Sequence, residues 1–100
     1  MNALQEHTSD ISKLCKIYKV KTLYAFGSVL TEKFNTESDI DLIVDFQPVE
    51  VLDYADNYFD LKFSLEHIFK RPIDLLEDKA IKNPYFRESV NKQRQLVYEH

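Results

Sequence analysis

The chain has 100 residues, of which 44% are apolar and 30% are charged, and its formal net charge is −4. This length and composition predict one globular domain, residues 1–100, rather than a disordered segment. The acidic balance argues against a broad electrostatic grip on DNA or RNA. It leaves room for a nucleotide, whose phosphates a divalent metal ion can bridge to carboxylates.

The beginning of the chain has neither a basic segment nor an apolar run of the kind found in secretion signals. No apolar stretch approaches the roughly 20 residues needed to cross a bilayer. The single cysteine, Cys15, excludes an internal disulfide and a cysteine-based zinc site, and we expect it to pack in the core. The expectation is a cytoplasmic protein without membrane contact.

The first half of the chain is predicted to form a helix and two strands. Apolar residues at helical spacing predict a helix over residues 2–18, with a later start near Asp10 as the alternative. Residues 22–26 are apolar on both faces, which favours a strand in the interior of a sheet. A connection over residues 29–38, rich in turn formers towards its end, leads to a second strand over residues 39–46.

The second half is predicted to form a helix over residues 49–69, a strand over 71–76 and a final helix that opens at Asn83-Pro84. The final helix is expected to reach Val97. The predicted order is therefore αββαβα, which indicates an α+β fold.

The long helix carries more apolar surface than one core-facing stripe needs. Its predicted stripe comprises Val51, Ala55, Tyr58, Leu65 and Phe69, while other apolar residues, among them Phe59 and Phe63, lie off it. Either the helix is squeezed between the sheet and another helix, or part of it meets a partner protein.

Gly27 is the only glycine, and it precedes Ser28 at the end of the predicted first strand. A turn of this kind can hold phosphate oxygens on its backbone N–H groups. Ten residues later, Asp39 and Asp41 share one side of the second strand, about 6.6 Å apart along it. Confined in a cleft, these two charges favour a cation, and carboxylate oxygens suit Mg²⁺.

Each signal also has a plain structural explanation. A lone Gly-Ser pair can be a simple turn, and two aspartates can mark a solvated strand entrance. Asp74 lies between Ile73 and Leu75, so it is either an exposed acid on an edge strand or a third carboxylate on the polar face. Together, the features favour a phosphate cradle that faces an acidic metal site.

The stretch Gly27-Ser28, ten residues, then Asp39-Ile40-Asp41 resembles the signature of the DNA-polymerase-β-like nucleotidyltransferase superfamily. The segment around Asp74 resembles the strand that carries the family's third carboxylate. The small size, and segments such as residues 82–89, are similar to the minimal nucleotidyltransferases of the antitoxin type.

The resemblance implies the polymerase-β-like nucleotidyltransferase fold, an α+β fold in which helices flank a small mixed sheet. It also implies that Asp39, Asp41 and Asp74 are catalytic and bind two Mg²⁺ ions. Gly27 and Ser28 would bind the nucleotide, with ATP as the substrate. Many members of the family have an arginine-rich segment after Gly-Ser, whereas this chain has Val29-Leu-Thr-Glu32. Lys33 is a candidate replacement.

The function implied by the resemblance is transfer of AMP from ATP to a tyrosine hydroxyl on a HEPN-type toxin, with no direct nucleic-acid contact. The missing arginine segment favours an alternative, an antitoxin that retains the fold and acts only by binding. A third hypothesis, a transferase for small molecules such as aminoglycosides, is disfavoured because the chain has no room for an added acceptor-binding domain. Arg71, Arg87 and Arg94 are interpreted as solvated surface charges.

Overall fold

The computed structural model describes residues 3–27, 39–48 and 51–100. The elements follow in the order α1 (Ala3–Glu6), α2 (Thr8–Ile17), β1 (Val20–Phe26), β2 (Ile40–Phe46), α3 (Val51–Phe69), β3 (Ile73–Glu77), the 3-10 turn η2 (Asp78–Ala80), α4 (Pro84–Gln93) and β4 (Gln95–Glu99). None of the helices described is both long and apolar enough to pass through a membrane.

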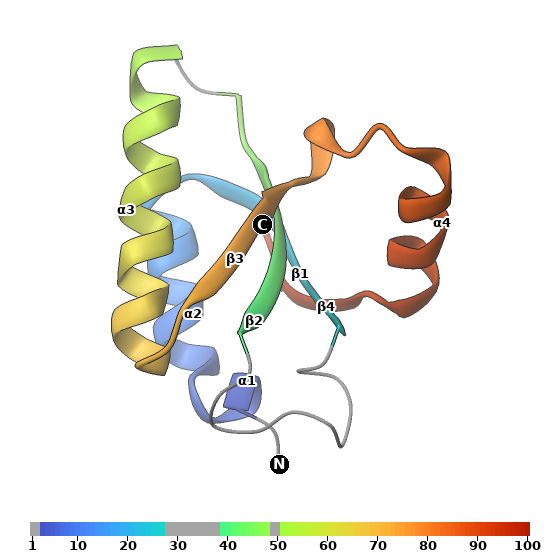
Figure 1. Ribbon diagram of the computed structural model, residues 1–100. Coiled ribbons are helices and arrows are strands. Elements are labelled where there is room, and N and C mark those ends of the chain that lie inside the picture. The colour runs from blue at the N-terminus through green and yellow to red at the C-terminus, as the bar shows by residue number, and fades with distance from the viewer. Residues whose placement is uncertain (1–2, 28–38, 49–50) are drawn as a thin grey trace.

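The four strands form one mixed sheet in the order β3-β2-β1-β4. β1 runs antiparallel to both of its neighbours, while β2 and β3 run parallel. Helices α2 and α3 lie together on one side of the sheet and α4 lies on the other (Figure 1). The predicted α+β class, with a small mixed sheet flanked by helices and β1 in its interior, is confirmed.

The main core fills the space between the sheet and helices α2 and α3. On strand β2, every second residue belongs to this core, because alternate side chains of a strand point to the same face of the sheet. Cys15 belongs to this core and is fully buried, as predicted, and burial raises the pKa of its thiol to about 12. The thiol therefore acts as a small apolar side chain. The core consists of Leu4, Ile11, Cys15, Val20, Leu23, Ala25, Ile40, Leu42, Val44, Phe46, Leu61, Leu65, Phe69, Ile73, Leu75 and Tyr98.

The predicted first helix is divided in two. α1 ends at Glu6 and α2 begins at Thr8, because His7 leaves the helical conformation with φ −118° and ψ 17°. The His7 ring packs edge-on against Phe69 at a centroid distance of 5.0 Å. The interruption therefore places the imidazole against the end of α3, a long-range contact that helical periodicity cannot reveal.

The expectation that the last helix reaches Val97 was wrong. α4 ends at Gln93, Arg94 takes an extended conformation, and Val97 lies in β4. Pairing with β1 supplies β4 with backbone hydrogen bonds from a strand far away in sequence. The predicted start of α4 is confirmed, since the Asn83 side chain accepts hydrogen bonds from the backbone N–H groups of residues 85 and 86.

Helix α3 holds the strand that carries Asp74. The Tyr58 hydroxyl donates a hydrogen bond to the Leu75 carbonyl, and the Ile73 N–H donates to the Glu66 carboxylate at 3.2 Å. These two hydrogen bonds attach β3 to α3 at neighbouring positions on either side of Asp74.

The outward surface of α3 differs in part from the predicted stripe. Ala55 is exposed, contrary to prediction, whereas Leu61 is fully buried. Phe59 and Phe63 are 50% and 59% exposed and stack on each other with their ring centroids 6.2 Å apart. Part of the surplus apolar surface of the helix therefore faces solvent.

Candidate active site

Parallel strands β2 and β3 bring two carboxylates next to each other. In their register Ile40 pairs with Ile73, and Asp41 pairs with Asp74. Ile40 and Ile73 are buried in the main core, so alternation turns Asp41 and Asp74 to the opposite face of the sheet. The register thus brings together two of the three acids that the resemblance assigns to one site.

The neighbouring acids affect the ionisation of Asp41. Partial burial raises the pKa of Asp41, and the negative charges of Asp74 and Asp39 and a hydrogen bond with Asp74 raise that pKa further. Asp39, immediately before β2, and Asp74 are both exposed, whereas Asp41 is half-buried. Asp41 is therefore the centre of the acidic group, with Asp39 just before the same strand and Asp74 on the next strand.

Gly27 ends β1 beside these acids. Its φ of +79° lies in the region that glycine adopts without strain. A Cβ atom at this position would lie only 2.7 Å from Oδ2 of Asp41, closer than non-bonded atoms approach. Two independent constraints therefore require glycine here, one from the backbone and one from the carboxylate packed against it.

A single row of residues crosses the sheet at this point. Phe26, the residue before Gly27, pairs with Asp41, which pairs in turn with Asp74. On the other side of β1, Ala25 pairs with Gln95 in antiparallel register. This register brings Arg94, the residue before Gln95, level with Phe26. The row thus runs from an acidic end on β3 to a basic end after α4.

Arg94 is a residue whose position the sequence did not reveal. Its guanidinium carbon lies 4.2 Å from the centre of the Tyr24 ring, a cation–π contact that orients the side chain. Within the described ranges it forms no ion pair with a carboxylate. By contrast, Arg87 is tied to Asp78 at 2.7 Å. The available signal in the sequence was the short apolar run Leu96-Val97-Tyr98 shortly after Arg94, which is typical of a strand.

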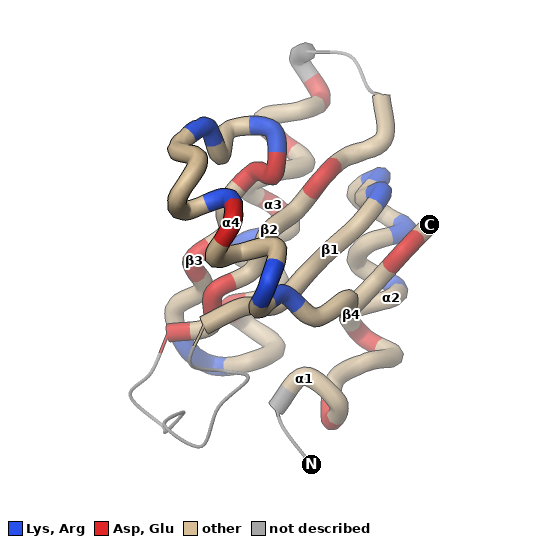
Figure 2. Tube along the Cα trace, turned by 90° about the vertical axis from the view of Figure 1, so that its right-hand side faces the viewer, with Lys and Arg blue, Asp and Glu red and all other residues tan. Residues whose placement is uncertain are grey.

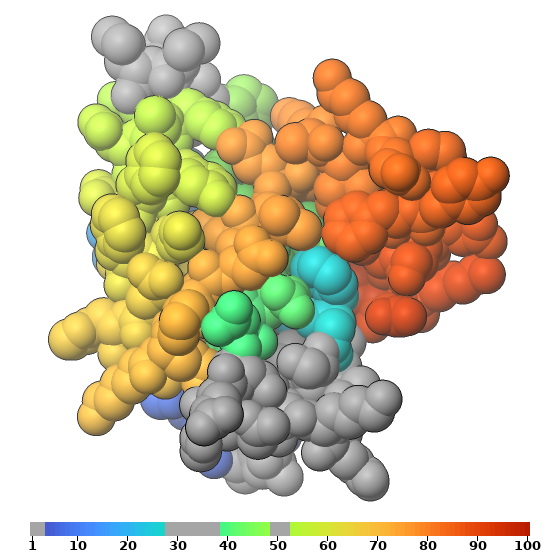
Figure 3. Space-filling model, in the orientation of Figure 1, coloured from blue at the N-terminus to red at the C-terminus, as the bar shows by residue number. Residues whose placement is uncertain are grey.

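The pictures show the same arrangement. In the space-filling view, the end of β1 (cyan), the start of β2 (green), β3 (orange) and the start of α4 (deeper orange) meet on one face (Figure 3). Figure 2 views the molecule from the α4 side and shows basic positions at the end of α4 and acidic positions at the starts of β2 and β3.

The donor set fits a divalent cation that also binds phosphate. Across residues 3–27, 39–48 and 51–100, no three His, Cys, Asp or Glu side chains are arranged to hold a metal ion by themselves. Asp41 and Asp74 nevertheless present hard carboxylate oxygen atoms from paired positions on neighbouring strands. Mg²⁺ is characteristically held by one or two carboxylates, with waters and substrate phosphates completing its octahedron.

Several predicted site residues lie outside the described residues. These are Ser28, the segment Val29–Glu32 and Lys33. The expected phosphate contact of Ser28 and the expected compensation by Lys33 therefore stay predictions, whereas Gly27 is placed directly against Asp41.

Comparison with known proteins places this geometry in a family. The family model described as "Polymerase beta, Nucleotidyltransferase" matches residues 9–100. The chain belongs to this nucleotidyltransferase family. The resemblance inferred from the Gly-Ser and Asp-x-Asp motifs is thereby confirmed, and the chain is a nucleotidyltransferase.

A relative from Methanocaldococcus jannaschii, named "Putative protein adenylyltransferase", is 34% identical over 98% of this chain and 99% of its own length. A solved structure of a "putative minimal nucleotidyltransferase" is 25% identical, covers 95% of both chains and superimposes with a TM-score of 0.76. This nucleotidyltransferase therefore shares its fold with both over nearly the full length.

Two solved toxin–antitoxin complexes have the same fold. One, described as a toxin-antitoxin with AMP-PNP, is 20% identical with a TM-score of 0.69, over 93% of this chain and 73% of that one. The other, a tri-AMPylated Shewanella oneidensis HEPN toxin in complex with an MNT antitoxin, is 19% identical with a TM-score of 0.64, over 97% and 73%. At these identities the likeness is one of fold.

Proposed function

We propose that this nucleotidyltransferase transfers AMP from ATP to a tyrosine hydroxyl on a HEPN-type toxin and so acts as an antitoxin in the cytoplasm. The observation that carries the proposal is the pairing of Asp41 with Asp74 on neighbouring strands, directly beside Gly27. The near full-length relative named as a protein adenylyltransferase supports a protein substrate. The fold shared with a complex of an AMPylated HEPN toxin supports the partner.

Each carboxylate has a distinct task in the proposed reaction. Asp39 and Asp41 would hold Mg²⁺ ions, which neutralise charge on the attacking and leaving oxygens when bound. Asp74 would join this metal site and accept the proton of the incoming hydroxyl. That hydroxyl oxygen forms a bond to the α-phosphorus, the α–β phosphoanhydride bond breaks, and pyrophosphate leaves.

The leaving pyrophosphate needs positive charge near the Gly27 turn. The segment after Gly27-Ser28 contains no arginine. Arg94 lies level with Phe26 on the far side of β1 and is oriented by the Tyr24 ring. We therefore assign Arg94, together with Gly27 and Ser28, to the β- and γ-phosphates, a role in which the planar guanidinium group is effective.

The test uses ATP labelled at the α-phosphate, Mg²⁺ and the toxin encoded beside the gene. Label on the toxin that disappears after substitution of its acceptor tyrosine by phenylalanine is the expected result. The double variant Asp39→Asn, Asp41→Asn should transfer no label and should leave the toxin active. The absence of label with all four nucleoside triphosphates would overturn the transferase proposal.

A second candidate is an antitoxin that acts only by binding. The specific observation in its favour is the absence of arginine and glycine in residues 29–32. In that case the Asp39→Asn, Asp41→Asn variant neutralises the toxin as well as the wild-type protein does, and neither protein transfers label.

A further inference from the structure

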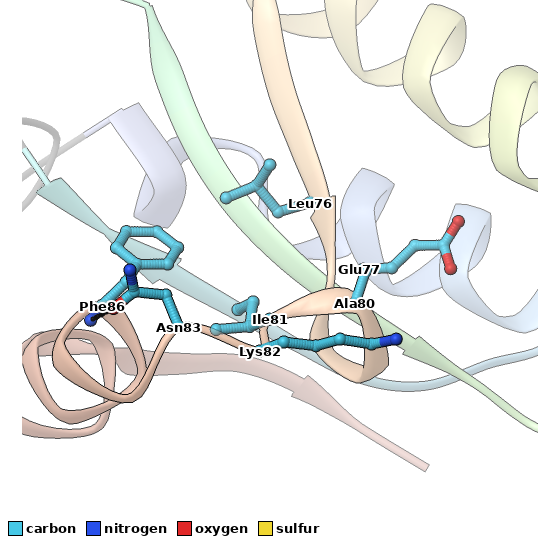
Figure 4. Close-up of a pocket in the computed structure, with 7 residues that line it drawn as sticks. All are labelled: Leu76, Glu77, Ala80, Ile81, Lys82, Asn83 and Phe86. Carbon is cyan, nitrogen blue, oxygen red and sulfur yellow. Dashed lines mark hydrogen bonds between the residues drawn. The ribbon is translucent and has the colours of Figure 1, made fainter.

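An open cavity of about 330 Å³ lies between the end of β3, the turn η2 and the first turn of α4. Its apolar end is formed by Leu76, Ile81 and Phe86, with the Asn83 side chain close by (Figure 4). The charged groups of Glu77 and Lys82 point away from Phe86, towards the other end. The carboxylate chemistry described above makes no use of this cavity.

The cavity adjoins the carboxylates. Leu76 follows Asp74 by two residues on the same strand, so the two side chains leave the same face about 6.6 Å apart. On the opposite wall, the Phe86 ring meets Phe26 edge-on with the centroids 6.0 Å apart. Phe26 is the register partner of Asp41. Both walls therefore lead back to the row of residues that contains Asp41 and Asp74.

The lining suits a flat, neutral heterocycle. Apolar side chains dominate the apolar end, and one aromatic ring, 39% exposed, can contact a planar ligand. The Oδ1 atom of Asn83 is occupied by two backbone N–H donors at 2.9 and 3.1 Å. Its Nδ2 group can therefore donate to a ligand, and the ring nitrogen atoms of a purine are acceptors. The volume lies at the lower end of the roughly 300–1,000 Å³ range of small-molecule pockets.

The far wall of the cavity is built to keep its shape. Arg87 donates from Nη1 to the Asp78 carboxylate at 2.7 Å and from Nη2 to the carbonyl oxygens of Asp78 and Ile81. One guanidinium group thus ties α4 to η2 and to the connecting segment that carries Ile81. A pre-formed wall lowers the entropy that a ligand loses on binding.

We propose that this cavity is the subsite for the purine base of the nucleotide. This inference rests on the proposed function only in taking a nucleoside triphosphate as the ligand. The phosphates extend from the carboxylates towards the Gly27 turn, and the nucleoside extends the other way, past Asp74 to Leu76, Ile81 and Phe86. A protein acceptor reaches Asp74 from beyond the exposed edge strand β3, so it does not compete for the cavity.

The test compares two ligands by calorimetry in the presence of Mg²⁺: α,β-methylene-ATP, which cannot be cleaved at the reacting bond, and inorganic triphosphate, which has no base. In the variant Ile81→Trp the new indole fills the cavity, and in Phe86→Leu the ring contact is lost. Phe59→Leu, on the outer surface of α3, is the matched control for an exposed phenylalanine.

The expected result is that Ile81→Trp weakens α,β-methylene-ATP binding at least tenfold and Phe86→Leu weakens it several-fold. Triphosphate affinity should stay within twofold of the wild type in both variants, which shows that the phosphate site is intact. Phe59→Leu should alter neither ligand.

Unchanged α,β-methylene-ATP affinity in both variants would overturn the inference. If transfer to the toxin is lost at the same time, the cavity is an acceptor site instead. If the nucleotide affinities respond as expected but no protein is ever labelled, the base subsite stands and the proposed protein target falls.

Discussion

Asp41 and Asp74 occupy paired positions on two parallel strands, and both side chains leave the face of the sheet opposite the main core. The pKa of Asp41 is accordingly raised, first by partial burial and then by the charges of Asp74 and Asp39. Folding therefore disfavours the charged form of Asp41 when no cation is bound.

This relationship predicts how stability depends on pH without a metal ion. Because the pKa of Asp41 is raised by folding, the folded state binds the proton more tightly than the unfolded state does. The resulting stabilisation is fully present below the ordinary pKa of about 3.9 and is lost as the pH rises through the raised value. In EDTA at pH 7, Asp41→Asn should therefore raise the melting temperature by a few degrees.

The control for this measurement is Asp56→Asn, which removes an exposed acid on α3. The advantage of Asp41→Asn should shrink towards pH 4, and Asp56→Asn should show no such trend. Added Mg²⁺ should stabilise the wild type but not Asp41→Asn. If Asp41→Asn is less stable than the wild type at pH 7 in EDTA, the charged form of Asp41 does not destabilise the folded protein and the prediction fails.

Gly27→Ala should damage both stability and chemistry. A non-glycine residue at φ +79° costs about 1–2 kcal/mol, and the new Cβ atom would push the Asp41 carboxylate from its position. A displacement of catalytic groups by about 1 Å can cost about 100-fold in rate. We expect a lower melting temperature and a loss of that order in kcat, measured with labelled ATP. Activity close to the wild type would show that the carboxylate has room to move.

Lys70→Gly should have the opposite sign. Lys70 directly follows α3 with φ +56°, a left-handed position in which glycine is the usual residue. Glycine relieves this strain but also gains freedom in the unfolded chain, so the expected net stabilisation is up to about 1 kcal/mol. Urea denaturation measures the difference, and transfer activity should be unchanged.

Arg94→Ala should raise the KM for ATP about tenfold or more, because a charged hydrogen bond to phosphate contributes about 1.5–3 kcal/mol. Inorganic triphosphate should lose affinity by a similar factor. Lys92→Ala is the matched control, since Lys92 is exposed and pairs with Glu88 at 3.0 Å. Equal effects of the two substitutions would assign Arg94 to general surface charge.

Arg87→Lys should destabilise the protein by about 1–2 kcal/mol. The ammonium group cannot reproduce the fork that reaches the Asp78 carboxylate and the two carbonyl oxygens. The wall around Ile81 should then loosen and weaken ATP binding more than triphosphate binding. Thermal unfolding and the same pair of ligands measure the two effects, and an equal loss for both ligands would argue against a role of Arg87 in shaping the cavity.

The sequence predicted those parts of the molecule whose signals are local. The caps and breakers at Asn83 and Pro84, the alternation around Asp74 and the isolated Gly27 all act within a few residues. The α+β class, three of the four strands and the acidic face therefore followed from reading the chain alone. The first strand begins at Val20, two residues earlier than predicted, and the third begins at Ile73, two residues later. Differences of this size are common at the ends of elements.

The features that the sequence did not predict depend on contacts between distant segments. Strand β4 exists because β1 offers it an edge, and the break at His7 coincides with a packing partner on α3. Arg94 becomes notable only once β4 brings it beside β1. The cavity likewise requires that the chain after β3 turn back so that the first turn of α4 lies beside the end of that strand, which no periodicity within α4 encodes.

Because β4 is the last element of the chain, the reactive acids and the strand that completes the sheet lie in different segments. All three acids belong to segments that precede α4, whereas Arg94 and the second neighbour of β1 come after it. A chain cut by a protease between α4 and β4 would keep Asp39, Asp41 and Asp74 yet expose β1 as a free edge. Such a fragment would be prone to aggregation and degradation, so a single cleavage near Arg94 would silence the protein without removing any of these three acids.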